Sequence, residues 1–245
     1  MSVPAPGKIG WFERACRHHA VGRAAGALLV LVPFAALIGF AIPFGSPETR
    51  PLARTLLSEG NVVEWIGFLG FLFGGIMGFR LSSRLRKLTE PVSVSRFYLV
   101  LAIVLVVLAG EEISWGQKVL GFTAPEFLQS INQQKETNVH NLPIIQELNE
   151  WFLIVVGLVG FAASTFWFHA KRWKFGTPPL VGHWFLLIAL MEIVDISPLH
   201  HLLTDEADYA LAYLIEVSEM LLGIACLLWV TMNGRILKGG AAARS

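Results

Sequence analysis

The sequence predicts an all-α polytopic membrane protein, a bundle of six transmembrane helices with both termini in the cytoplasm. Three observations support this fold class. Of the 245 residues, 54% are apolar and only 15% are charged. Six apolar segments are long enough to be read as membrane crossings, and Lys and Arg gather in alternate connections. With no internal repeat or composition shift, we expect one transmembrane domain over residues 1–245.

The six expected helices follow one another along the chain. They cover about residues 24–44, 62–79, 97–120, 151–168, 180–196 and 210–232. The first is too long, and too far from the start, to be a cleaved signal peptide, so we expect it to be retained. The second contains glycines at GxxxG spacing, a pattern that lets a neighbouring helix approach closely.

One connection, residues 121–150, is too long to be a simple turn. Its stretch "TAPEF" ends at Phe127, which would share one face of a short helix with Leu128 and Ile131. Such an apolar face is typical of a helix that lies on a membrane surface. We therefore expect an outer loop or interfacial helix at 121–150.

The basic residues predict the orientation. If the N-terminus is cytoplasmic, 15 of the 19 Lys and Arg residues fall in inner segments, leaving outside only Arg50, Arg54, Lys118 and Lys135. This asymmetry is the positive-inside pattern of a plasma-membrane protein. The formal net charge of +1 gives no indication of a nucleic-acid partner, so the expected partners are membrane lipids.

Acidic residues collect at one depth of this expected bundle. Counted along the helices from their inner ends, seven carboxyl groups lie about 18 to 24 Å into the membrane. They are Glu64, Glu111, Glu112, Glu192, Asp195, Glu216 and Glu219. Buried carboxylates at one level repel each other, so bound protons, a metal ion or water must compensate them.

Histidines on the same side extend this layer into a candidate metal centre. His200 and His201 follow the fifth expected helix directly. Carboxylates with imidazoles suit zinc or manganese, and carboxylates alone suit calcium. The candidate ligands of a divalent metal ion are Glu192, Asp195, His200, His201, Glu216 and Glu219.

A second group carries the candidate catalytic side chains. These are Glu111, Glu112, Gln117 and His140. Glu111 or Glu112 would act as general base and then general acid on a metal-bound water. Gln117 would orient a polar head group, and His140 would fold down over the layer.

Two motifs resemble a known signature. "EEISWGQ" at Glu111–Gln117 and "ETNVHN" at Glu136–Asn141 resemble the signature of a family of uncharacterised bacterial multi-helix membrane proteins. The resemblance implies a multi-pass protein of the bacterial inner (plasma) membrane and brings no activity with it. The paired glutamates are coarsely similar to those of CAAX-protease-like membrane enzymes, although Gly116 stands where that family has arginine. Histidines and an aspartate between membrane helices are also similar in style to alkaline-ceramidase-like hydrolases.

Three functions follow from these patterns, and the sequence leaves the choice open. The first is a membrane-embedded, metal-dependent hydrolase or transferase that acts on a lipid or lipid-linked substrate at the outer leaflet. The second is proton or cation transport through the carboxylate cluster. The third is a non-catalytic role in membrane assembly, because polar clusters between helices also fix helix packing.

Overall fold

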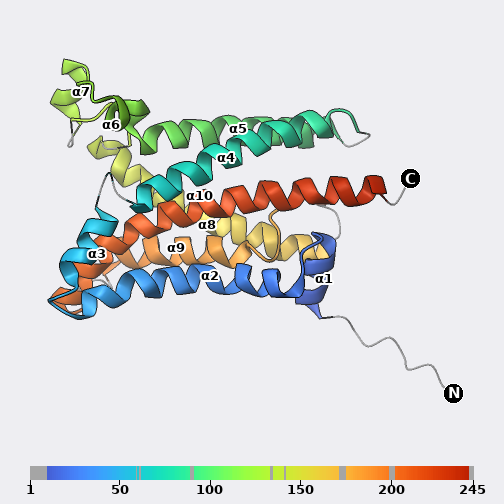
Figure 1. Cartoon of the computed structure of the whole chain (residues 1–245), viewed down its shortest axis with the longest axis horizontal. Coiled ribbons are helices and arrows are strands. Elements are labelled where there is room, and N and C mark those ends of the chain that lie inside the picture. The colour runs from blue at the N-terminus through green and yellow to red at the C-terminus, as the bar shows by residue number, and fades with distance from the viewer. Residues whose placement is uncertain are drawn as a thin grey trace.

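The computed structural model shows a helical bundle (Figure 1). It describes residues 10–58, 60, 62–88, 91–132, 135–140, 142–170, 175–198 and 202–242. The structure is 81% helical, and the regular secondary structure within these ranges is all helix. The expected fold class, an all-α membrane protein, is therefore confirmed at this level.

The helices run in the following order along the chain. They are α1 (Trp11–His18), α2 (Arg23–Ala41), α3 (Arg50–Leu57), α4 (Val62–Leu85), α5 (Val92–Glu112), α6 (Gln117–Leu120), α7 (Glu126–Ile131), α8 (Pro143–Ala170), α9 (Gly182–Ile196) and α10 (Asp205–Ala242). Short 3-10 turns, η1 (Ile42–Gly45) and η2 (Ser114–Gly116), follow α2 and α5.

Five helical stretches among the described residues are long and apolar enough to cross a membrane. They are Arg23–Gly45, Arg50–Leu85, Val92–Glu112, Pro143–Phe166 and Asp205–Leu237. Their outward faces are apolar as well, as Leu28 and Leu31 show on α2, where about 60% of each side chain is exposed. Exposed leucines along a whole helix are expected where lipid replaces water. The chain is therefore a membrane protein.

The sixth expected crossing, residues 180–196, is a shorter and more buried helix. The 15 residues of α9 span about 22 Å, less than the hydrocarbon thickness of about 30 Å. Its residues Trp184, Phe185 and Ile188 are at most 1% exposed. Hydropathy alone cannot distinguish such a core helix from a lipid-facing one, so six spans are not confirmed.

The chain before α9 is buried without being helical. Pro178 and Pro179 keep helix from starting earlier, since proline lacks an amide donor. The Tyr98 hydroxyl donates to the Phe175 carbonyl at 2.6 Å, and Asn233 Nδ2 donates to the same carbonyl at 3.1 Å. Side chains of α5 and α10 thus satisfy backbone groups that water cannot reach.

Close glycine contacts hold α4 against α10, as the GxxxG spacing predicted. A Cβ on Gly70 would lie 2.6 Å from the carbonyl carbon of Gly223, and one on Gly223 would lie 2.7 Å from the Gly67 carbonyl oxygen. On the other side of α4, Ser82 and Ser95 each donate a hydroxyl hydrogen bond to the other's carbonyl, at 2.8 and 3.0 Å. This reciprocal pair joins α4 to α5.

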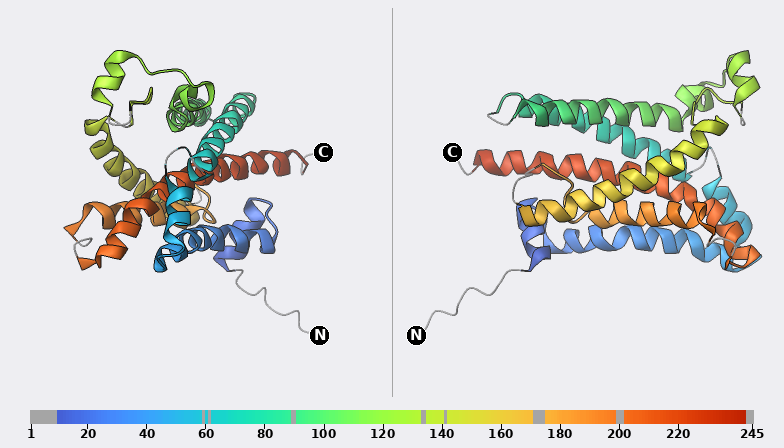
Figure 2. Two further views of the ribbon diagram at one scale, coloured as in Figure 1. Left: turned by 60° about the vertical axis from the view of Figure 1, so that its left-hand side comes forward. Right: turned by 180° about the vertical axis from the view of Figure 1, so that it is seen from behind.

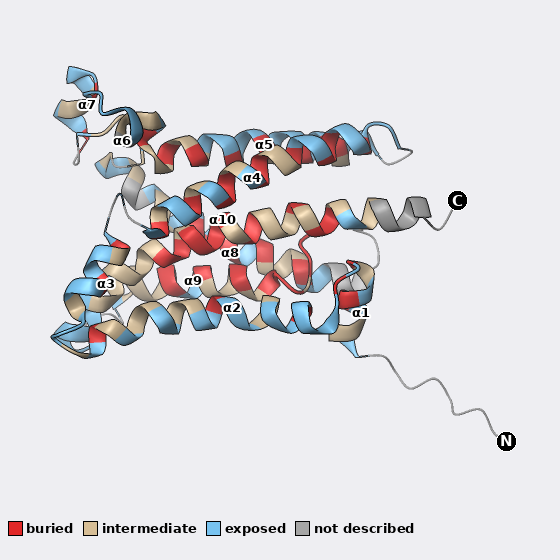
Figure 3. Cartoon of the chain, in the orientation of Figure 1, coloured by how far each residue is buried: buried red, intermediate tan, exposed pale blue. Residues whose placement is uncertain are grey.

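The arrangement separates two ends of the bundle. In Figure 1, α1 and the end of α10 lie at one end, while α3, α6 and α7 lie at the other, which we call the distal end. The view from behind in Figure 2 shows α8 crossing beside α9. One side of the bundle is the pair α4 and α5, and the other is the pair α8 and α9. Helix α10 lies between them and contacts both α4 and α9. Buried residues concentrate on the faces of these helices that are turned toward each other (Figure 3).

Several expected boundaries were wrong. The helix expected at residues 210–232 runs from Asp205 to Ala242 as α10. The helix expected at residues 97–120 ends as α5 at Glu112, and the helix expected at 151–168 begins at Pro143 as part of α8. The connection expected at 121–150 therefore lies earlier in the chain, at residues 113–142. It does contain a short helix, α7, whose Phe127 is 71% exposed.

Candidate functional site

A reversal of the chain ends α5 at the distal end. Ser114 and Trp115 have φ of 48° and 53°, and Gly116 follows at 91°. The left-handed region is unfavourable for residues other than glycine, at about 1 to 3 kcal/mol each. The indole of Trp115 folds back over Gly110, where a Cβ would lie 3.0 Å from the ring. Its Nε1 donates to Oε1 of Glu111 at 2.6 Å.

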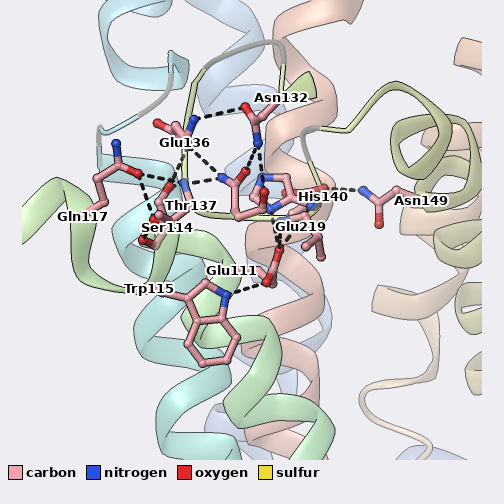
Figure 4. A network of polar contacts seen from close by, with 12 residues as sticks. Glu111, Ser114, Trp115, Gln117, Asn132, Glu136, Thr137, His140, Asn149 and Glu219 are labelled. Atoms are coloured by element: carbon pink, nitrogen blue, oxygen red, sulfur yellow. Dashed lines mark hydrogen bonds and ion pairs between the residues drawn. The ribbon is translucent and has the colours of Figure 1, made fainter. Parts of the chain in front are cut away.

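The other carboxylate oxygen of Glu111 holds the segment that carries His140. Oε2 accepts the backbone N–H of Val139 at 2.7 Å and that of His140 at 3.1 Å. The Nδ1 atom of the His140 ring lies 3.6 Å from the same oxygen. Glu111 is only 8% exposed, so these contacts replace water around its carboxylate. Figure 4 shows the group from close by.

Ser114 begins a second set of contacts to the same segment. Its hydroxyl donates to Oε2 of Glu136 at 2.6 Å. Asn138 Nδ2 donates to that carboxylate oxygen at 2.7 Å and to the Ser114 hydroxyl at 3.1 Å. Asn132 in turn donates to the Asn138 side-chain oxygen at 2.9 Å. Ser114 and Asn138 are fully buried, as expected for satisfied polar groups.

Gln117 pairs with Thr137 at the edge of this group. Its Oε1 accepts the Thr137 backbone N–H at 2.7 Å and the Thr137 hydroxyl at 2.8 Å. That hydroxyl also reaches the Ser114 carbonyl. We refer to the whole set as the Glu111 network, which comprises Glu111, Ser114, Trp115, Gln117, Asn132, Glu136, Thr137, Asn138 and His140.

The two sequence motifs are therefore the two halves of one site. Glu111 and Gln117 come from the first motif, and His140 comes from the second, about 28 residues later along the chain. Among the described non-glycine residues with left-handed backbone, Ser114, Trp115 and Lys135 all lie in or beside the network, and only Ala20 lies elsewhere. Such concentration of strain is a feature of functional sites.

Glu112 points elsewhere. Its Oε2 lies 3.5 Å from the Cβ position of Gly67, which is also 3.5 Å from the Cα of Met220. The side chain therefore enters the seam between α4 and α10. Glu111 and Glu112, both expected among the catalytic side chains, thus enter different parts of the structure.

A separate acidic group lies between α8, α9 and α10, and we call it the Glu192 group. Glu192 is fully buried, and its Oε1 accepts the Ser218 hydroxyl. Its Oε2 has no hydrogen-bond partner among the described residues. Glu219, Asp195 and Glu150 are close enough to act on it electrostatically. Glu219 accepts a hydrogen bond from Asn149 Nδ2 at 2.8 Å.

The predicted metal ligands are brought together only in part. Glu192, Asp195 and Glu219 share the Glu192 group, and Glu216 lies one turn before Glu219 on α10. Within the described ranges, no three His, Cys, Asp or Glu residues are placed to hold a metal ion. His200 and His201 lie outside the described residues. The divalent metal ion therefore stays a prediction.

Glu64 was placed by its depth in the same layer of acidic residues. Its side chain instead contacts the backbone at the start of its own helix. Its Oε2 accepts the backbone N–H of Gly60, just before α4 begins. This bond fixes the chain that leads into the helix, and an acidic side chain in the first turn complements the helix dipole. Glu64 thus stabilises the start of α4.

Several members of the two groups were missed by the sequence reasoning. Asn149 and Ser218 carry no periodic or spacing signal, because each acts through a partner distant in sequence. Asn132 bonds to Asn138, six residues later, and was overlooked because it precedes the second motif. Glu136 and Thr137 could have been found, since they lie within the "ETNVHN" motif.

Comparison with protein families, with curated proteins and with solved structures finds no match to this chain.

Proposed function

We propose that the chain is a membrane-embedded hydrolase or transferase that acts on a lipid or lipid-linked substrate at the outer leaflet. In this proposal His140 is the general base and Glu111 orients its ring. The observation that carries the proposal is the 3.6 Å approach of the Glu111 carboxylate to Nδ1 of His140. The orientation of the bundle, with both termini in the cytoplasm of a bacterial inner membrane, belongs to the same proposal.

A carboxylate beside one imidazole nitrogen is a known way to prepare the other nitrogen for proton transfer. The carboxylate holds the ring in one orientation and one tautomer, as in the carboxylate–histidine pairs of hydrolases. His140 then accepts a proton from water, or from an acceptor hydroxyl, while that oxygen attacks the electrophilic centre of the substrate. The same proton is returned to the leaving group when its bond breaks.

The surroundings of the network support a lipid substrate. Trp115, a member of the network, is 51% exposed, and Leu120 at the end of the following α6 is 76% exposed. An apolar surface next to a polar group at the end of a membrane helix suits the boundary between acyl chains and head groups. The Gln117 side chain lies at the edge of the network, where it would orient a polar head group.

The direct test is a turnover assay on the reconstituted full chain. Vesicles containing phospholipids and a lipid-linked phosphosugar are incubated with wild type, His140→Gln and the matched control His18→Gln, and products are identified by mass spectrometry. We expect one lipid class to be converted, and His140→Gln to lower the rate about 100-fold or more. Full turnover by His140→Gln would refute the proposed base. A parallel reaction with chelator, and elemental analysis of the purified protein, test the divalent ion.

A second candidate is a non-catalytic assembly role, which the exposed α7 favours. Phe127 is 71% and Ile131 is 40% exposed on this short helix, and the Glu111 network holds the segment that follows it. In that case Phe127→Ser would reduce assembly with a partner, whereas His140→Gln would be tolerated.

Transport is less well supported by the buried residues that the structure describes in α9 and α10. The next buried residues of α9 and α10 toward the termini, Ile188, Leu221 and Ala225, are apolar, and the buried polar residues Asn233 and Tyr98 lie further along and bond to each other. A proton or cation path needs polar groups or water along its length. Flux of protons or cations in reconstituted vesicles would revive this alternative.

A further inference from the structure

A cavity of about 520 Å³ lies at the distal end between α3 and the start of α10. Two prolines, two arginines, two carboxylates and a tyrosine line it. A volume of this size accommodates a small ligand. The cavity shares no residue with the Glu111 network or with the Glu192 group, so what it binds does not depend on the proposed function.

The cationic side comes from α3. Arg50 and Arg54 lie one turn apart and therefore share a helix face. Arg50 Nε donates to the Phe44 carbonyl at 3.0 Å, which fixes the side chain. The Arg54 guanidinium lies 5.8 Å from the ring centre of Tyr209 and 5.9 Å from that of Tyr213. Planar guanidinium groups held in this way are suited to binding phosphate oxygens in pairs.

The anionic side comes from α10. Asp205 and Glu206, its first two residues, line the same cavity beside Tyr209. Among the described residues, neither carboxylate forms an ion pair with Arg50 or Arg54. Charges of both signs thus face one space without neutralising each other by direct contact.

We propose that this cavity binds the head group of a zwitterionic phospholipid. The phosphate binds Arg50 and Arg54, and the ammonium group binds Asp205 and Glu206 beside the Tyr209 ring, which also attracts a cation. Exposed apolar residues next to the cavity provide a surface for acyl chains. Leu52 on α3 is 56% exposed, and Leu202, three residues before Asp205, is 80% exposed.

The test is lipid binding to the full chain in detergent, measured by native mass spectrometry. The probes are phosphatidylethanolamine and the anionic phosphatidylglycerol, titrated separately. Wild type is expected to bind phosphatidylethanolamine at least about fivefold more tightly. Arg50→Gln should weaken both lipids about tenfold, because it removes a charge-assisted contact to phosphate. Glu206→Gln should abolish the preference while leaving phosphatidylglycerol bound as well or better.

Matched control variants separate the loss of a charge in the cavity from the loss of the same charge elsewhere on the chain. Arg86→Gln and Glu126→Gln remove the same charges elsewhere on the chain and should leave both affinities unchanged. Thermal unfolding of each variant shows that the fold is retained, and Arg50→Gln is chosen over Arg54→Gln because Arg54 packs on two rings. Equal binding by wild type, Arg50→Gln and Glu206→Gln would overturn the proposal. Displacement of the lipid by millimolar soluble phosphoethanolamine would show that the head group alone is the ligand, whereas no displacement would show that the acyl chains contribute.

Discussion

Glu111 contacts His140 twice through one oxygen atom. Its Oε2 accepts the His140 backbone N–H at 3.1 Å and lies 3.6 Å from Nδ1 of the His140 ring. One side chain at the end of α5 therefore fixes both the backbone and the ring of a residue that follows a long connection. A carboxylate can satisfy several N–H donors at once because it is purely an acceptor.

Glu111→Gln should loosen the segment that carries His140. An amide side chain places an NH₂ group where either Trp115 Nε1 or the Val139 and His140 amides now donate, so at least one donor loses its acceptor. We expect the Val139 and His140 amides to exchange hydrogen at least tenfold faster, and stability to fall by about 1 to 3 kcal/mol. Hydrogen exchange read by mass spectrometry measures this, with Glu126→Gln as control. Unchanged protection in Glu111→Gln would contradict the contacts described.

Gln117 and Thr137 should be energetically coupled. The two residues share two hydrogen bonds across the network, and residues in such contact typically show interaction energies of about 0.5 to 3 kcal/mol. The measurement is a double-mutant cycle of Gln117→Ala and Thr137→Val by thermal unfolding. We expect the double variant to be more stable than the sum of the single losses predicts. Strict additivity would show that the motifs are not docked.

Gly70→Ala should disrupt the packing of α4 on α10. The new Cβ would lie 2.6 Å from a backbone carbon of Gly223, and overpacking of this kind costs about 1 to 3 kcal/mol. Gly39→Ala on α2 is the matched control, since nothing lies within 4 Å of its Cβ position. We expect that control to be neutral or slightly stabilising. Equal unfolding midpoints for the two variants would argue against the close α4–α10 contact.

His19 should make stability fall in mild acid. Burial, together with the positive charges of His18 and Arg235, lowers the pKa of His19 to about 3 from 6.5. As the pH falls below 6.5, the unfolded chain binds a proton that the folded chain does not, so stability is lost between pH 6.5 and 3. Between pH 7 and 5 the loss should be about 2 kcal/mol. Thermal unfolding of wild type and His19→Gln across this window measures it, and parallel pH profiles would contradict the assignment.

Composition and charge were enough to predict the fold class, because lipid imposes helices and long apolar runs on any chain of this kind. Composition and charge did not predict the residue at which α5 ends. The apolar pattern continues through Val119 and Leu120, and the break at Ser114 depends on a segment about 25 residues further along. The helix expected at 180–196 is present as α9, but its shortness and burial were not predicted, since a buried helix and a lipid-facing one are equally apolar.

The structure brings some of the predicted site residues together, but not in the arrangement that the sequence reasoning assumed. The motifs contain Glu111, Gln117 and His140, which the structure brings into one network. The metal layer was argued from depth along the helices, and depth says nothing about direction around each helix axis. Glu64 turns to its own helix start, Glu112 turns to Gly67, and Glu192 turns to Ser218.

The central claim is that Glu111 acts on the reaction through His140. The most direct measurement is a double-mutant cycle on turnover of the lipid substrate, using Glu111→Gln, His140→Gln and the double variant. If Glu111 works by orienting His140, the double variant should be no slower than His140→Gln alone, because groups that act as a unit are not additive. If the two losses multiply in the double variant, Glu111 and His140 act independently and the proposed pair is wrong.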